Sequence, residues 1–218
     1  MSIHVQTFPT PQAASEALAR LLAERLSAGG RAVLGGGNTP LAAYRAFGQA
    51  DLLWNRLQLI ASDERCLSEG HPERNDVQIA KAIGTTVLPY TLHSFQAELG
   101  PERSAELSEG LVESLLPFDL VTLGLGEDAH TASLWPHVDL GSERLVLPVH
   151  GAPKPPPERV SLSPKALSQT QLVVYLVTGA SKREALARFL RGEDVPPSRI
   201  RAPEVLVFAD EAAYPGEV

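Results

Sequence analysis

The chain has 218 residues, of which 44% are hydrophobic, so it is long enough to bury a continuous core as one α/β domain over residues 1–218. Its net charge of −7, with no basic run to offset it, argues against nucleic-acid or anionic membrane partners. An anionic ligand would therefore need a few cations gathered in one cleft, together with backbone donors.

The expected compartment follows from the cysteine count and the N-terminal residues. Cys66 is the single cysteine and cannot form an internal disulfide, which is compatible with a reducing compartment. Residues 1–6 lack the features of a signal peptide, and no apolar run approaches the ~18 residues of a membrane span. We expect a cytoplasmic protein.

The expected elements alternate between strands and helices. After a first strand from about residue 3, Thr10 and Pro11 predict the start of a helix that runs to Leu26. Residues 32–34 and 57–61 are apolar runs that predict strands, followed by helices with Thr39 and Asn75 as N-caps. Further strands are expected at 118–123, 145–149, 159–162, 172–177 and 205–208, and further helices at 102–116 and 182–190.

This alternation predicts a mainly parallel sheet with helices on both faces. The proline-rich stretch 151–157 is short and lies between two expected strands, so we interpret it as a stiff loop rather than a domain linker. In open α/β sheets, ligands bind beyond the carboxyl ends of the strands, and four loops at such positions carry polar residues.

The first of these loops is residues 35–40 (GGGNTP). Glycines let exposed backbone N–H groups approach an anion, and the following helix adds the positive end of its dipole. Phosphate is the natural ligand of such a loop, although the pattern is neither a dinucleotide fingerprint nor a nucleotide P-loop. A plain tight turn with an N-cap explains the glycines equally well.

The second loop contains Asp63, Glu64 and Arg65. Adjacent side chains point to different sides, so one carboxylate can act in a cleft while the other orients Arg65, whose planar fork suits phosphate or carboxylate. A solvated charged loop is the competing interpretation.

The third loop holds Asp128 and His130 in the segment 128–133 (DAHTAS). A histidine there can act as a general base near neutral pH, and a carboxylate two residues away can fix its tautomer. A structural histidine bonded to the backbone is the alternative. A metal site of Asp128, His130 and His137 is less favoured, because no usual zinc spacing is present.

The fourth feature is a pair of cations, Arg159 and Lys182. Lys182 follows the expected strand 172–177 and lies near the start of a helix, where an ammonium opposes the helix dipole. A bound anion would help to explain that position. The alternative is that Lys182 is an ordinary surface lysine with no ligand.

Together and in this order, these segments resemble the 6-phosphogluconolactonase family over nearly the whole chain. Residues 124–136 (GLGEDAHTASLWP) look like its G-[LM]-G-x-D-G-H-T-A-S-L-F-P motif, which is the most specific of the set. The other segments look like its S-G-G-[ST]-T-P loop (35–40), its D-E-R and S-N residues (63–65 with 74–75) and its K-P-P-x-R stretch (154–159).

Among the residues that depart from the family pattern, Gly35 and Arg74 stand where it has Ser, and Ala129 stands where it has Gly. If that glycine adopts a positive φ, Ala129 strains the loop by about 1 kcal/mol.

The resemblance implies a Rossmann-like fold shared with glucosamine-6-phosphate deaminase and ribose-5-phosphate isomerase A. It implies hydrolysis of 6-phospho-D-glucono-1,5-lactone in the oxidative pentose phosphate pathway by a monomer or small homo-oligomer, without metal or organic cofactor. His130 would be the general base that activates water, and Asp128 would orient it. The implied phosphate site comprises Gly36, Gly37, Asn38, Thr39, Arg159 and Lys182.

The resemblance does not divide the remaining roles among the other polar residues. Arg65 can serve substrate hydroxyls, the phosphate or the developing oxyanion, and Asp63 is a further candidate catalytic carboxylate.

Two other functions are weighed against this one. Glucosamine-6-phosphate deaminases resemble the chain at the glycine loop and Asp63, but their D-E-Y and D-G-H-I-A-F-N-E-P motifs are not matched at Arg65 or at residues 131–136. A sugar-phosphate sensor of a transcription regulator would need a DNA-binding module, for which the chain leaves no room before its first expected strand. A stand-alone binding protein would not need His130.

Overall fold

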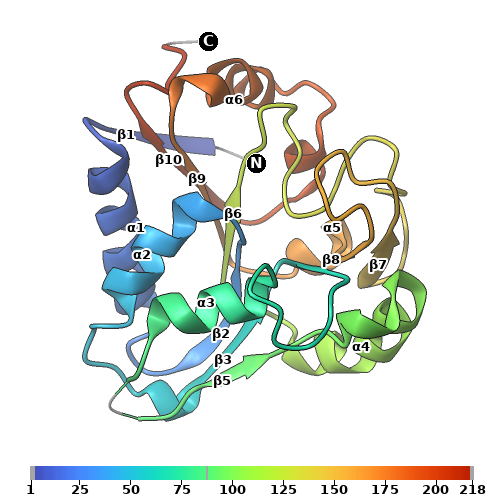
Figure 1. The fold of residues 1–218 in the computed structure, drawn as a ribbon. Helices are drawn as coiled ribbons and strands as arrows, with labels where there is room; N and C mark the ends of the chain where they lie inside the picture. The colour runs from blue at the N-terminus through green and yellow to red at the C-terminus, as the bar shows by residue number, and fades with distance from the viewer. Residues whose placement is uncertain (1–2, 87, 217–218) are drawn as a thin grey trace.

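The computed structural model describes residues 3–86 and 88–216, and a seven-stranded parallel sheet forms the centre of this part of the chain (Figure 1). The order of its strands is β1-β10-β9-β6-β2-β3-β5. Their bounds are β1 (Ile3–Phe8), β2 (Gly30–Leu34), β3 (Leu57–Ala61), β5 (Thr91–His93), β6 (Leu120–Gly124), β9 (Leu172–Val177) and β10 (Glu204–Asp210). The expected mainly parallel sheet is confirmed.

Helices cover both faces of this sheet (Figure 1). Right-handed crossovers place α1, α2 and α3 on one face, where the chain moves from β1 towards β5, and place α4, α5 and α6 on the other, where it returns. The bounds are α1 (Pro11–Arg25), α2 (Asn38–Phe47), α3 (Asn75–Ile83), α4 (Pro101–Leu115), α5 (Pro164–Leu167) and α6 (Arg183–Leu190). Short 3-10 helices are η1 (Trp54–Arg56), η2 (Ala97–Leu99), η3 (Ala180–Lys182) and η4 (Pro196–Arg199).

The point where the chain changes face lies between β2 and β6. These neighbours are in register at Ala32 with Leu120 and at Val33 with Val121. The loops that leave their carboxyl ends go to opposite faces, so they separate and open a crevice beyond the sheet edge. Residues 35–37 and 125–135 therefore meet at this crevice.

A second, antiparallel sheet in the order β4-β8-β7 was not anticipated from the sequence. Its strands are β4 (Asp63–Arg65), β7 (Val146–Val149) and β8 (Arg159–Leu162). The polar segment expected as a loop is strand β4, because it pairs with β8 and places Arg65 opposite Arg159. Residues 151–157 connect β7 to β8, as expected for a loop between two strands.

The helix starts were predicted with mixed success. The Thr10 hydroxyl accepts a hydrogen bond of 3.1 Å from the N–H of Ala13, which confirms the N-cap of α1. The predicted cap at Thr39 is wrong, because α2 begins at Asn38 and its N-cap residue is Gly37. The φ of Gly37 is 96°, which glycine adopts without strain. The predicted cap at Asn75 is also wrong, since Asn75 is the first residue of α3.

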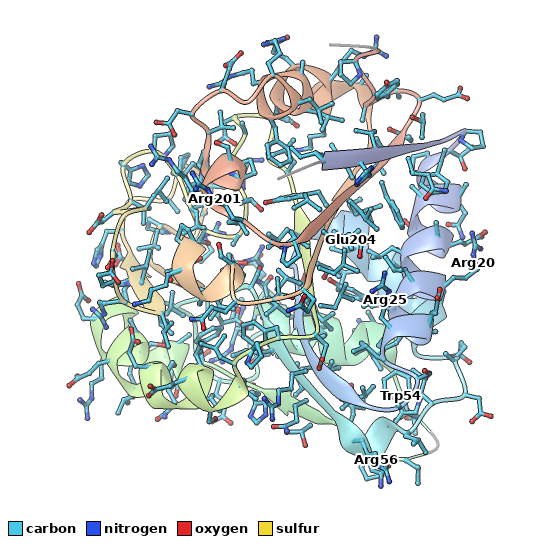
Figure 2. All side chains as sticks on the ribbon, turned by 180° about the vertical axis from the view of Figure 1, so that it is seen from behind. Arg20, Arg25, Trp54, Arg56, Arg201 and Glu204 are labelled. Carbon is cyan, nitrogen blue, oxygen red and sulfur yellow. The ribbon has the colours of Figure 1, made fainter. Side chains whose placement is uncertain are left out.

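The N-terminal helix is also tied to the sheet by an ion pair. Arg25 Nη2 of α1 lies 3.2 Å from Glu204 Oε2 of β10, and the two labelled side chains lie near each other in the rear view of Figure 2. Both are partly exposed, so this pair contributes little to stability. None of the described helices has the length and apolar character needed to cross a membrane.

Candidate active site

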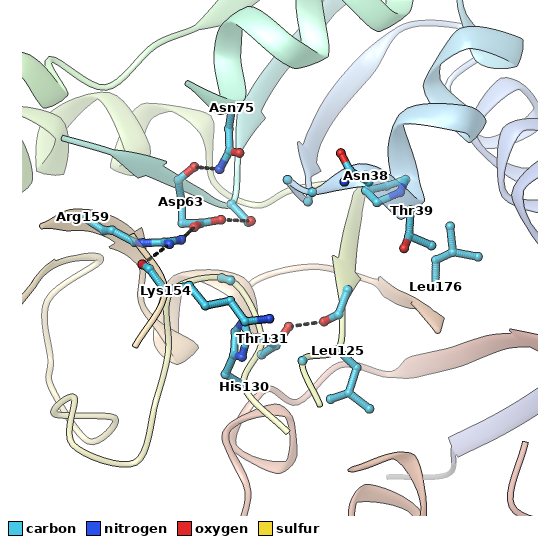
Figure 3. A pocket seen from close by; sticks show the side chains of 18 of the residues that line it. Asn38, Thr39, Asp63, Asn75, Leu125, His130, Thr131, Lys154, Arg159 and Leu176 are labelled. Atoms are coloured by element: carbon cyan, nitrogen blue, oxygen red, sulfur yellow. Dashed lines mark hydrogen bonds and ion pairs between the residues drawn. The ribbon is translucent and has the colours of Figure 1, made fainter. Parts of the chain in front are cut away.

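A cavity of about 410 Å³ opens at the crevice between β2 and β6, and it collects residues from all four predicted loops. Figure 3 shows Asn38, Asp63, His130 and Arg159 around it, on different elements. Of the predicted site residues, Asp128 alone does not line the cavity: Gly36, Gly37, Asn38, Thr39, Asp63, Arg65, His130, Arg159 and Lys182 all do. The tertiary fold therefore brings together residues that lie between positions 36 and 182 of the sequence.

The glycine loop approaches the cavity closely because its first two glycines are packed against other chain segments. A Cβ at Gly36 would lie 2.4 Å from Asn75 Oδ1, and one at Gly35 would lie 3.0 Å from the carbonyl oxygen of Thr122. The buried hydroxyl of Tyr44 donates to the Gly35 carbonyl at 2.9 Å. Burial raises the pKa of Tyr44, so the group stays a neutral donor.

The N-terminus of α2 begins directly after this loop. Among the described side chains, none caps it with a hydrogen bond. The first N–H groups of a helix have no intrahelical acceptor, and the helix dipole is positive at this end. Asn38 and Thr39 thus present a site suited to an oxyanion beside the cavity.

Asp63 is buried, with 4% of its surface exposed, and it organises two cavity walls. Its Oδ1 accepts from the Ser62 hydroxyl at 2.7 Å, and its Oδ2 accepts from the Ser133 hydroxyl at 2.6 Å. Arg159 Nη1 lies 3.9 Å from the same Oδ2. The carboxylate is therefore engaged by fixed partners, an arrangement that positions neighbouring groups.

Arg159 is held in place through its own loop as well. Its Nε donates to the carbonyl of Pro156 at 3.1 Å, and its Nη2 donates to that of Lys154 at 2.9 Å. Burial lowers the pKa of Arg159; the charge of Asp63 opposes this, and that of Arg65 reinforces it. The guanidinium remains charged, because arginine is deprotonated only far above neutral pH.

Glu64 does not orient the Arg65 side chain, contrary to one sequence-based interpretation. Its carboxylate accepts from the backbone N–H groups of Asn75 at 2.6 Å and Asp76 at 2.8 Å, and so caps α3 from outside the helix. Burial raises the pKa of Glu64 to about 7, against the lowering effect of these hydrogen bonds. The Arg65 Nη1 donates instead to the carbonyl of Glu73.

Two buried polar atoms beside the cavity lack a hydrogen-bond partner among the described residues. One is Arg65 Nε, which is a donor, and the other is Asn75 Oδ1, which is an acceptor. Both residues line the cavity. Because an unpaired buried polar group is costly, these atoms are available to a polar ligand or to water.

His130 and Asp128 form the pair that the sequence predicted. His130 Nδ1 contacts Asp128 Oδ1, and the pKa of Asp128 lies below its ordinary value, because the hydrogen bond and charge of His130 outweigh the raising effect of burial. An ionised carboxylate only accepts hydrogen bonds, so Nδ1 carries a proton, and in the neutral imidazole it is Nε2 that has the free lone pair. Gly126 is required beneath this pair, since a Cβ there would lie 2.0 Å from His130 Nδ1.

The loop that carries His130 is strained at two alanines. Ala129 has a φ of 65° and Ala132 has a φ of 49°. The φ of Ala129 fits the expectation that a glycine at this position would adopt the left-handed region, and a Cβ there costs roughly 1–2 kcal/mol. The turn is closed by the N–H of Gly126, which donates a hydrogen bond of 2.7 Å to the His130 carbonyl.

Lys182 and Lys154 add positive charge to the lining of the cavity. Lys182 ends η3 and is the N-cap residue of α6, so it lies near a helix start as predicted, one residue before the helix begins; 20% of its side chain is exposed. Burial lowers the pKa of Lys182, and Lys154 acts in the same direction, against Glu127, whose carboxylate lies 3.9 Å away. An anion in the cavity would offset both effects.

Lys154 and Trp135 were not singled out from the sequence, although both lie within quoted motifs. Lys154 lines the cavity together with Arg65, Arg159 and Lys182, which makes this site basic in an acidic protein. The sequence signal for Lys154 is its place in residues 154–159, five residues before Arg159, the first residue of strand β8.

Comparison with known proteins places this arrangement in a family. Residues 9–208 match the family model described as glucosamine-6-phosphate isomerases/6-phosphogluconolactonase. The chain belongs to this family. A 6-phosphogluconolactonase of Streptomyces coelicolor is 36% identical over 203 residues, which cover 83% of this chain and 78% of that protein.

Solved structures of family members share the fold. The crystal structure of 6-phosphogluconolactonase from Thermotoga maritima superposes with a TM-score of 0.87 at 24% identity, covering 96% of this chain and 100% of that one. A monomeric glucosamine-6-phosphate deaminase superposes with a TM-score of 0.81 at 20% identity, covering 96% of this chain and 98% of that one. The fold is therefore common to both kinds of enzyme, and the site has to distinguish them.

Proposed function

We propose that this chain hydrolyses 6-phospho-D-glucono-1,5-lactone to 6-phospho-D-gluconate, with His130 as general base. The observation that carries the proposal is the His130–Asp128 pair, which stands at the edge of a cavity lined by four cations. Support comes from the 6-phosphogluconolactonase of Streptomyces coelicolor, which is 36% identical to this chain.

The phosphate of the substrate is assigned to the glycine loop and the cations. The N–H groups of residues 36–39 at the start of α2 would receive its oxygens, and Lys182 and Arg159 would neutralise its charge. Lys154 adds to the same positive region. Binding energy from the phosphate, remote from the reacting carbon, would hold the ring for attack.

His130 Nε2 would remove a proton from water as the water oxygen attacks C1 of the lactone. The bond between C1 and the ring oxygen would then break, and the imidazolium would return the proton to that oxygen. Asp128 would stabilise the imidazolium and keep its orientation. The new carboxylic acid then ionises and releases one proton to solution.

Arg65 and Asp63 would act around this step. The unpartnered Nε of Arg65 is a donor for a substrate hydroxyl or for the oxyanion that develops at C1. Asp63, enclosed by Ser62 and Ser133, would position Arg159 rather than exchange protons.

Proton release on addition of freshly made 6-phosphogluconolactone, measured over the spontaneous background, tests the proposal. We expect His130→Ala to lower kcat by about 100-fold or more, with an unchanged circular dichroism spectrum. The matched control is His93→Ala, which removes a histidine on β5 that bonds to Gln58. Near-normal turnover in His130→Ala would remove it as the base.

An ammonia assay with glucosamine 6-phosphate runs in parallel. Release of ammonia without lactone hydrolysis would show that the chain acts as a glucosamine-6-phosphate deaminase. Tight sugar-phosphate binding without either reaction would make it a binding protein.

A further inference from the structure

Trp135 is a large buried side chain that contacts the candidate base pair. Its exposed fraction is 3%, and it packs in a small apolar cluster with Val149 and Ala152. Val149 ends β7 and Ala152 follows in the connection to β8, so the indole is wedged between the His130 loop and the β7–β8 connection. Its position is therefore set by two separate parts of the chain.

The indole contacts both members of the base pair. Trp135 Nε1 donates to Asp128 Oδ2 at 3.0 Å, and the Trp135 and His130 rings stack with centroids 4.5 Å apart and an interplanar angle of 28°. Asp128 Oδ1 is engaged by His130. Both carboxylate oxygens are thus held, although 47% of the Asp128 side chain is exposed and would otherwise be free to rotate.

The same indole contacts a cation of the cavity. The guanidinium carbon of Arg159 lies 5.5 Å from the ring centroid of Trp135, within the range of a cation–π interaction. Arg159 is the residue held near Asp63 on β8. One side chain therefore contacts both the loop that carries the base and the Arg159 guanidinium of β8.

We infer that Trp135 is a positioning residue for the reaction proposed above: its N–H fixes the Asp128 carboxylate, and its ring fixes the His130 imidazole and the Arg159 guanidinium. The inference rests on the proposed function for its catalytic consequence. The hydrogen bond from Trp135 to Asp128 can be tested without any substrate. Phenylalanine retains a stacking ring but lacks the N–H donor, so the two contributions can be separated.

The kinetic test compares Trp135→Phe with Trp54→Phe. Trp54 is an equally buried indole whose Nε1 donates to the Ala50 carbonyl at 3.1 Å, and it precedes β3, at the sheet end opposite to the site (Figure 2). We expect Trp135→Phe to lower kcat about tenfold at a nearly constant KM, because the ground-state contacts to phosphate remain. Trp54→Phe should leave kcat unchanged.

A double-mutant cycle separates positioning from a general loss of structure. If Trp135 acts through Asp128, Trp135→Phe should cost nothing further in the Asp128→Ala background. An equal loss of kcat in both backgrounds would overturn the inference. Full kcat in Trp135→Phe, with an active wild type, would overturn it while leaving the proposed function intact.

An NMR readout needs no activity. The chain has two tryptophans, and hence two indole N–H signals in a ¹⁵N-labelled sample, assigned with the two Phe variants. Asp128→Ala should move the Trp135 proton signal upfield and leave that of Trp54 in place. If the chemical shift of the Trp135 indole proton is the same in wild type and Asp128→Ala, the inference is overturned. If the Trp135 signal moves on Asp128→Ala but the wild type does not open the lactone, the proposed function would be refuted and the coupling of Trp135 to Asp128 supported.

Discussion

The hydroxyl of Ser133 donates a hydrogen bond of 2.6 Å to the buried carboxylate of Asp63, across 70 residues of sequence. This bond ties the loop that carries His130 to strand β4, which carries Arg65. The two walls of the cavity are thereby held in one arrangement. Substitution of Ser133 or Asp63 should therefore lower both the free energy of unfolding and the activity.

Loss of the hydrogen bond between Ser133 and Asp63 should destabilise the protein. Ser133→Ala leaves Asp63 Oδ2 with only the more distant Arg159, so we expect the free energy of unfolding to fall by about 1–3 kcal/mol. Urea unfolding measures it, with Ser114→Ala as control, because Ser114 is exposed and its hydroxyl bonds within α4. Equal stabilities of the two variants would show that the Asp63 bond contributes nothing net.

Lys182→Ala should mainly weaken substrate binding. The ammonium would attract the phosphate equally before and during the reaction, so we expect KM to rise about tenfold with a smaller change in kcat. Lys165→Ala is the matched control, since Lys165 lies outside the cavity and pairs with Glu143 at 2.9 Å. A fall in kcat at constant KM would instead assign Lys182 to the chemical step.

Ala129→Gly should relieve backbone strain in the His130 loop. The left-handed φ of 65° costs an alanine roughly 1–2 kcal/mol, of which the greater freedom of glycine in the unfolded chain removes about 0.4–1 kcal/mol. We expect an unchanged or slightly higher free energy of unfolding. Ala17→Gly, within helix α1, should lower it by about 1 kcal/mol. Similar losses in both variants would contradict the strain.

The pH dependence of stability should contain a contribution from His150. Burial lowers its pKa, but hydrogen bonds to Glu102 at 2.6 Å and Glu158 at 2.5 Å raise it above its ordinary value of 6.5. Because the native state then binds the proton more tightly than the unfolded state, this stabilisation is fully present below pH 6.5 and is lost as pH rises through the native pKa.

Urea midpoints of wild type and His150→Gln, measured from pH 5.5 to 8.5, should therefore converge at the alkaline end. His93→Gln is a control of opposite sign, since burial lowers the pKa of His93 and its contribution is lost as pH falls below 6.5. Parallel curves for wild type and His150→Gln would show that the two carboxylates do not hold the charged imidazole.

Hydrophobic patterning predicts the alternation of strands and helices and the sheet edge where the polar loops lie, but it does not predict strands β4 and β5 or helix α5. Apolar runs followed by polar loops predict strand ends, and parallel strands bring their carboxyl ends to one edge. The residue pair Asp128 and His130 was identified because its two members are separated by one residue, so a local turn suffices to join them.

The partners of the other polar residues come from segments far apart in the chain. Asp63 meets Ser133 and Arg159 because β4 pairs antiparallel with β8, a contact that no local pattern encodes. Glu64 caps α3 from another element, where the sequence pointed to Asn75. Side-chain roles that depend on segments far apart in the chain follow from packing, which periodicity and capping preferences do not describe.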